Sequence, residues 1–192
     1  MKRIYWIVIS LLFIVNCSKN ETEEKIQLNK IVSAVLKYES NRNALKDNIY
    51  LVNPELLKLT IYTPSLKEIS GEEPGPPPFF NKSIVRLLDF KKSKSEERKS
   101  DSLNLLTQNN YILDSLKVDD KINFNIKLAH KEEVDHPIKL YQFSNPLYFN
   151  DKFAYIEYKY RDTSFGIGFG YLLEKQKDGT WLVKDIVNTF IT

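Results

Sequence analysis

Two stretches near the C-terminus decide the fold class: KFAYIEYKY at residues 152–160 and FGIGFGYLLEKQKDGTWLVKDIV at residues 165–187. Successive side chains of the first stretch alternate between two faces, as they do in a β-strand. One face takes Ala154, Ile156, Tyr158 and Tyr160, and the other takes Phe153, Tyr155, Glu157 and Lys159. The second stretch predicts a long strand, a turn at Asp178-Gly179 and a closing strand. Together with the alternating INFNIKLAH at residues 122–130, these stretches predict an antiparallel β-meander.

An amphipathic helix is predicted far upstream of these strands, from Glu23 to about Arg42. Its apolar positions recur at steps of three and four residues: Ile26, Ile31, Val32, Val35, Leu36 and Tyr38. Such a stripe usually packs against the protein core, so we expect the helix to lie on the sheet. Helices early in the chain and strands late define an α+β fold, which we expect to form one domain over residues 23–192.

The middle of the chain carries weaker patterns. ELLKLTIYT at residues 55–63 is typical of a strand that ends at Pro64. SKSE at residues 93–96 matches a capping box, which predicts a helix with Leu103 and Leu106 on its apolar face that ends near Asn109 and Asn110. GEEPGPPP at residues 71–78 is a loop, which either joins two elements or presents a polyproline segment to a partner.

The N-terminus, MKRIYWIVISLLFIVNC, has the layout of a secretory signal. Lys2 and Arg3 precede an apolar run from Ile4 to Val15. Spanning a bilayer as a helix takes roughly 20 residues. The run is shorter than that, so we expect residues 1–16 to be removed as a signal peptide.

The last residues of this segment, IVNC, resemble the lipobox of bacterial lipoproteins, in a relaxed form because Asn16 stands where Gly, Ala or Ser is usual. The resemblance implies that the sulfur of Cys17 carries a diacylglycerol and that Cys17 becomes the first mature residue. Residues 17–22 then form a lipidated tether. The glutamates that follow, Glu21, Glu23 and Glu24, either begin the helix or resemble the acidic signals of surface-exposed lipoproteins.

Two other roles of Cys17 are a catalytic thiol and a disulfide partner. The chain has a single cysteine, so no intramolecular disulfide forms, and a nucleophile needs a positioned base. Lipid attachment therefore explains this cysteine best. It predicts a protein of the cell envelope, anchored in the outer membrane.

Composition argues against nucleic acid as a partner. The formal net charge of the whole chain is +3, and it falls to +1 when Lys2 and Arg3 leave with the signal. A nucleic-acid binder would show a clustered basic face instead.

Two motifs suggest cofactor or metal chemistry. GIGFG at residues 166–170 resembles a phosphate loop, but strand residues follow it where a helix would be needed, so we expect its glycines to admit a helix or an aromatic side chain of the same domain. HKEEVDH at residues 130–136 gathers two histidines and three carboxylates, but its spacing is more typical of a charged loop than of a zinc site. We therefore expect no cofactor, no metal and no enzymatic activity.

The segments LYQFSNPLYFNDKFAYIEYKY and GFGYLLEKQKDGTWLVKD resemble the C-terminal part of small uncharacterised lipoproteins of the Bacteroidota type. The shared features are Ser144-Asn145-Pro146-Leu147, a glycine-containing strand and Gly179-Thr180-Trp181. The resemblance implies a fold and no activity. We expect a lipid-anchored envelope protein with a binding or structural role, whose ligand or partner face includes Tyr155, Tyr158, Tyr160 and Trp181.

Three more specific functions stay open at this stage. One is an immunity or inhibitor protein that binds a toxin or hydrolase acting in the envelope. The others are a carrier of a small ligand and an envelope enzyme, both of which require a pocket with converging polar groups.

Overall fold

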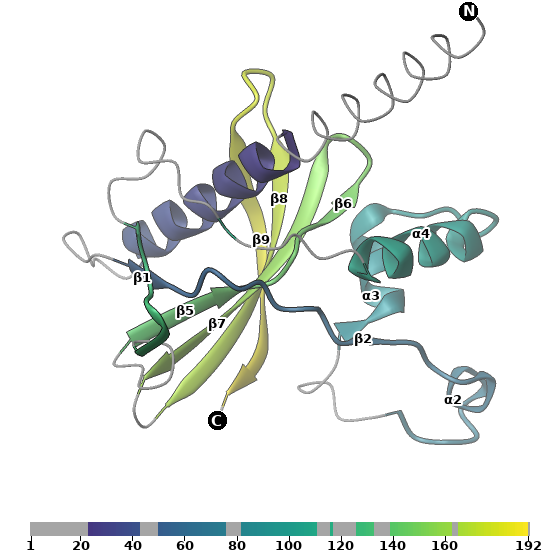
Figure 1. Cartoon of the computed structure of the whole chain (residues 1–192). Coiled ribbons are helices and arrows are strands. Elements are labelled where there is room, and N and C mark those ends of the chain that lie inside the picture. Colours follow the sequence, from purple (N-terminus) through teal and green to yellow (C-terminus); the bar gives the residue numbers. More distant parts are fainter. Residues whose placement is uncertain are drawn as a thin grey trace, which may run out of the picture.

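The computed structural model describes residues 23–42, 50–75, 82–110, 116, 126–132, 139–162 and 165–191 (Figure 1). A helix covers residues 23–42. The elements that follow it are β1 (Tyr50–Val52), β2 (Ile61–Tyr62), α2 (Leu66–Ser70), β3 (Lys82–Ser83), α3 (Ile84–Lys91), α4 (Arg98–Asn110), β4 (Ile126–Leu128), β5 (Lys139–Phe143), β6 (Leu147–Phe149), β7 (Phe153–Asp162), β8 (Gly166–Lys175) and β9 (Trp181–Ile191). The fold is α+β, as the sequence predicts. No helix of the described residues is long and apolar enough to cross a membrane.

A mixed sheet organises the domain, in the strand order β4-β1-β5-β7-β8-β9 with β6 paired to β7. The strands β5, β7, β8 and β9 are antiparallel neighbours and form the expected meander. In contrast, β1 runs parallel to both β4 and β5. The prediction of a purely antiparallel meander was therefore wrong in one part: the INFNIKLAH segment supplies β4, which pairs in parallel with β1 and not with the meander strands, and β1 joins the sheet from a distant part of the chain.

The strands β5 and β6 pair with the same edge of β7 but are out of phase by one residue. Phe143 of β5 lies opposite Tyr158, whereas Leu147 of β6 lies opposite Tyr155. Four residues of one segment thus span three of the other, as in a β-bulge. The hydroxyl of Ser144 accepts a hydrogen bond from the Glu157 amide at 2.9 Å within this break. Such a slip turns the odd-numbered side chains to the opposite face of the sheet.

Two apolar clusters result, one on each face of the sheet. The first lies under the helix of residues 23–42 and includes Leu28, Ile31, Val32, Val35, Leu36, Phe143, Ile156, Tyr158, Tyr171 and Trp181. The second lies against α3 and α4 and includes Leu87, Leu88, Leu105, Leu147, Phe149 and Tyr155. The predicted alternation along β7 is confirmed, because Ile156 and Tyr158 belong to the first cluster and Tyr155 to the second.

The helix of residues 23–42 confirms the predicted range and most of the predicted stripe. Ile26 and Tyr38 are exposed, however, and Leu28, which the stripe omitted, is fully buried. The buried arc is therefore narrower than the pattern of apolar letters suggests, and it is centred on Ile31, Val35 and Leu28.

Several expectations for the middle of the chain were wrong. ELLKLTIYT forms only the two-residue strand β2 and one isolated bridge at Leu57. Ser93 does not cap α4, because it ends α3: Lys92 has φ 56° and the Ser93 amide donates to the Leu88 carbonyl at 3.0 Å. The capping box lies instead at Ser65 and Glu68, at the start of α2.

The apolar face of α4 also differs from the prediction. Leu103 is 59% exposed, whereas Leu105 is buried. Leu106 is partly buried against the second cluster, as expected. The helix ends at Asn110, where the sequence predicts its end.

The helix α2 stands apart from the sheet and buries none of its residues (Figure 1). Leu66 and Ile69 are 84% and 68% exposed, respectively. The hydroxyl of Tyr62 donates a hydrogen bond to Glu68 and ties this short helix to β2. The loop expected at residues 71–78 is confirmed over residues 71–75, while residues 76–78 lie outside the described residues.

Candidate functional site

Of the residues predicted to act, Cys17 lies outside the described residues, as do the signal peptide and the tether up to residue 22. Lipid attachment therefore stays a prediction. The histidine-rich segment is described only up to residue 132, and among the described residues no group of three metal-binding side chains occurs.

The four aromatic residues of the predicted partner face do not share one surface. Tyr155 is fully buried in the second cluster, stacks on Phe90 at 5.9 Å and donates a hydrogen bond to Glu157 at 2.6 Å. Tyr158 and Trp181 are buried on the opposite face of the sheet, where Tyr160 packs partly buried against the first cluster.

Tyr158 and Trp181 are also held at different points along the helix of residues 23–42. The Trp181 indole donates to Gln27 near the start of the helix at 3.0 Å, whereas Tyr158 donates to Glu39 near its end at 3.3 Å. Both side chains are therefore engaged in attaching the helix to the sheet, and the part these four aromatic residues play in binding stays a prediction.

A buried carboxylate joins the end of this helix to the sheet. Glu39 is only 3% exposed and accepts hydrogen bonds from the hydroxyls of Tyr171 at 2.8 Å and Tyr158 at 3.3 Å. Arg42 lies 3.4 Å from the same carboxylate, and its guanidinium covers the Phe169 ring. Burial of a charge is stabilising only when the charge is paired and hydrogen-bonded, and these contacts supply both.

The glycines of β8 confirm one further expectation. A Cβ atom on Gly170 would lie 1.9 Å from the Tyr155 hydroxyl, so the absent side chain is what lets the aromatic ring cross the strand. GIGFG is thus part of a strand whose glycine admits an aromatic side chain of the same domain.

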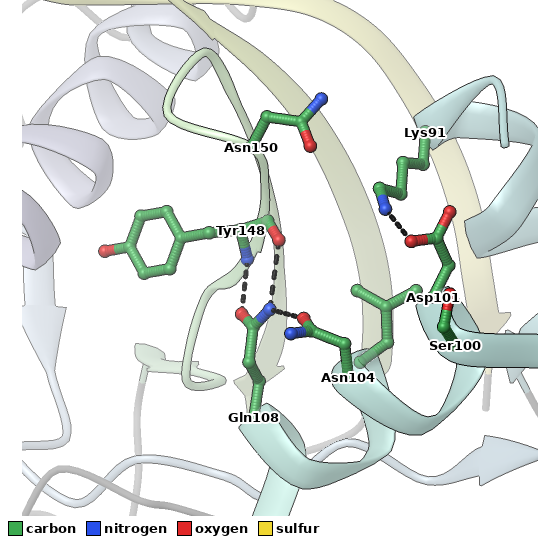
Figure 2. A pocket seen from close by; sticks show the side chains of 8 residues that line it. Lys91, Ser100, Asp101, Asn104, Gln108, Tyr148 and Asn150 are labelled. Carbon is green, nitrogen blue, oxygen red and sulfur yellow. Dashed lines mark hydrogen bonds and ion pairs between the residues drawn. The ribbon is translucent and has the colours of Figure 1, made fainter. Parts of the chain in front are cut away.

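An open polar pocket of about 440 Å³ lies between α3, α4 and the end of β6. Figure 2 shows Lys91 and Asp101 on one side of it, Gln108, Asn104 and the Tyr148 backbone on the other, and Asn150 near both. Ser100 and Leu105 complete the lining. The Tyr148 ring points away from the pocket and packs against Trp181 (Figure 2).

An ion pair fixes one wall of the pocket. The Lys91 ammonium donates to the Asp101 carboxylate, and their side chains are only 19% and 13% exposed. This hydrogen bond from Lys91 lowers the pKa of Asp101, and burial opposes the lowering. The carboxyl is therefore ionised at neutral pH.

An amide side chain fixes the opposite wall. Gln108 accepts from the Tyr148 amide at 2.8 Å and donates to the Tyr148 carbonyl at 3.1 Å. Its nitrogen also donates to the side-chain oxygen of Asn104 at 2.6 Å. Gln108 thus bonds to β6 as a neighbouring strand would, and it orients Asn104 toward the pocket.

The next residue of α4 makes the same kind of contact elsewhere. The amide of Asn109 pairs with the backbone of Leu59, accepting at 3.1 Å and donating at 2.8 Å. Consecutive amides at the end of α4 therefore attach the helix to two separate chain segments, and this arrangement holds the pocket wall in place.

None of the pocket residues was singled out from the sequence. A signal was nevertheless present, because Asp101, Asn104 and Gln108 recur at steps of three and four and form a polar stripe on one face of α4. Their partners Lys91 and Asn150 come from other elements, and no local pattern connects them to α4.

A comparison with known protein families, with curated proteins and with solved structures gives no match.

Proposed function

We propose that this chain is a lipid-anchored protein of the bacterial cell envelope, held in the outer membrane, with a binding role. The observation that carries the proposal is the order of segments at the N-terminus: a cationic start, an apolar run, the sole cysteine and a short polar stretch. Diacylglycerol and acyl chains on Cys17 would anchor the domain stably, since each buried methylene contributes about 0.8 kcal/mol.

The geometry of the domain supports a position close to the membrane. The helix begins at Glu23, six residues after Cys17. An extended chain spans at most about 3.5 Å per residue, so these residues reach about 20 Å. The start of this helix and the β8–β9 hairpin beside it, where Trp181 bonds to Gln27, would then lie near the membrane surface.

The binding role is supported by the pocket between α3, α4 and β6. Small-molecule sites are concave and enclose roughly 300–1,000 Å³, and the volume of this pocket falls within that range, while its lining is more polar than that of most such sites. The pocket lies beside α3 and α4, and its residue Tyr148 packs against Trp181 at 6.3 Å, close to the start of the helix of residues 23–42 (Figure 1).

Fractionation of a lipoprotein-processing bacterium tests the anchor. The wild-type chain should sediment with the outer membrane and dissolve in detergent, and Cys17→Ala should leave that fraction. Ser18→Ala, one residue further along, is the matched control and should stay with the membrane. A wild-type protein found in the soluble fraction would contradict the proposal.

A further inference from the structure

We propose that the pocket between α3, α4 and β6 binds a neutral saccharide; this rests on the proposed binding role of the domain and names the ligand class for its pocket. The pocket is defined by Lys91, Ser100, Asp101, Asn104, Leu105, Gln108, Tyr148 and Asn150.

The walls of the pocket are rigid before any ligand arrives. The Lys91–Asp101 pair closes one wall, and the three hydrogen bonds of Gln108 close the other. Groups that are already held in place cost little entropy when a ligand binds, so this pocket is prepared for a ligand that uses its remaining hydrogen-bonding groups.

Those remaining groups belong to two asparagines, a lysine and a serine. Within the described residues, the Asn104 nitrogen and the whole Asn150 amide have no hydrogen-bond partner. Lys91 keeps two further N–H groups after it bonds to Asp101. The Ser100 hydroxyl donates to the Glu97 carbonyl at 2.9 Å, so its oxygen is left to accept. The free groups thus include both donors and acceptors.

Charge selects against ions. The lining holds one cation and one anion, Lys91 and Asp101, and they neutralise each other across a hydrogen bond. A phosphate or carboxylate that approaches Lys91 would be repelled by the neighbouring Asp101 carboxylate. A cation that approaches Asp101 would be repelled by the Lys91 ammonium. An uncharged ligand loses nothing to this pair and can still accept the remaining Lys91 hydrogens.

The bottom of the pocket is apolar. Leu105 lines it but is 1% exposed, so this side chain lies at the base and not at the rim. A ligand that suits the pocket therefore carries several hydroxyl groups, no net charge and an apolar C–H surface. Saccharides combine these three properties, because each hydroxyl both donates and accepts while the ring carbons form a C–H face.

The test is calorimetric titration of the full chain, extracted in a detergent without a sugar headgroup so that the detergent does not compete. The probes are N,N′-diacetylchitobiose and maltotriose, with inorganic phosphate as the charged comparison. We expect heat from at least one of the two saccharides and none from phosphate.

Three variants connect the heat to the pocket. Asn104→Leu removes the side-chain amide of Asn104. Asn150→Gly removes the side-chain amide of Asn150, and glycine readily keeps the left-handed backbone at φ 59°. Each should weaken binding about three- to tenfold, the value of one neutral hydrogen bond. Thr107→Ala, an exposed residue of α4 that does not line the pocket, is the matched control and should bind like the wild type.

The proposal is overturned if neither saccharide gives heat, if both asparagine variants bind like the wild type, or if phosphate binds in place of the saccharides. Unchanged unfolding temperatures of the variants show that a loss of binding is local. Membrane location is measured separately, so a lipid-anchored protein that binds no saccharide would overturn this inference and leave the anchor standing, and a soluble protein that binds one would do the reverse.

Discussion

Replacing Glu39 by glutamine tests how the N-terminal helix is attached to the sheet. The substitution keeps the size of the side chain and removes its charge. Hydrogen bonds to charged groups contribute about 1.5–3 kcal/mol and neutral ones about 0.5–1.5 kcal/mol. The bond from Tyr171 at 2.8 Å should therefore lose about 1 kcal/mol, and the longer one from Tyr158 at 3.3 Å should lose less.

Two further terms affect the total for Glu39→Gln. The half-exposed Arg42 pair contributes at most about 1 kcal/mol. Removing a buried charge also removes its desolvation cost, which offsets part of the loss. We expect the free energy of unfolding to fall by about 1–2 kcal/mol. Glu39→Ala should lower it by about 2–4 kcal/mol, because two buried tyrosine hydroxyls lose this acceptor while the desolvation cost of the carboxylate disappears.

The assay is urea unfolding followed by circular dichroism, with Tyr171→Phe as the second arm of a double-mutant cycle. Glu39→Gln weakens the hydrogen bond that Tyr171→Phe removes, so the two effects should fall short of additive by about 1 kcal/mol. Lys37→Gln, at an exposed position of the same helix, is the control and should change stability by less than about 0.5 kcal/mol. Additive effects of Glu39→Gln and Tyr171→Phe would show that these two side chains are not energetically coupled.

Three other predictions follow from single contacts. Gly170→Ala should destabilise the protein by about 1–3 kcal/mol in urea unfolding, because its Cβ would overlap the Tyr155 ring. Asn109→Ala should cost about 2–4 kcal/mol by leaving a buried backbone N–H and C=O unpaired, whereas the exposed neighbour Asn110→Ala should be near neutral. Asp101→Asn should destabilise the protein at pH 7 and much less at pH 2. The pKa of the Asp101 carboxyl is lower in the folded protein than in the unfolded one, so the ionised carboxyl stabilises the fold at pH values above about 4. This contribution is lost as the pH falls through the pKa of the folded state.

Each of these predictions has a measurement that would contradict it. Gly75→Ala is the control for the β8 glycine, since a Cβ there has no neighbour closer than 3.9 Å, and equal effects at the two glycines would exclude the steric explanation. Equal losses of unfolding free energy in Asn109→Ala and Asn110→Ala would show that the hydrogen bonds between Asn109 and the Leu59 backbone do not stabilise the fold. A destabilisation by Asp101→Asn that is the same at pH 2 and pH 7 would show that the ion pair contributes nothing.

The sequence predicted those parts of the fold that local periodicity specifies. The alternation along β7 and the turn at Asp178-Gly179 are both confirmed, with Gly179 at φ 81° and Thr180 bonded to the Asp178 carboxylate. These features depend on residues close together in the chain, and the physics that forms them acts over the same short range.

The parts that were missed depend on distant contacts. Whether Tyr50 to Val52 forms a strand is decided by its parallel neighbours β4 and β5, which no local pattern reveals. Ser93 begins a sequence typical of a helix N-cap. In the structure it follows the left-handed Lys92, and the Ser93 backbone amide donates to the Leu88 carbonyl at the end of α3. The pocket was missed for the same reason, because its walls come from α3, α4 and the β6–β7 turn.

Intact mass spectrometry of the membrane-extracted protein tests the central proposal most directly. We expect a chain that begins at Cys17, without residues 1–16, and that carries the added mass of a diacylglycerol and acyl chains. A chain of all 192 residues, or one that begins elsewhere and carries no lipid, would contradict it.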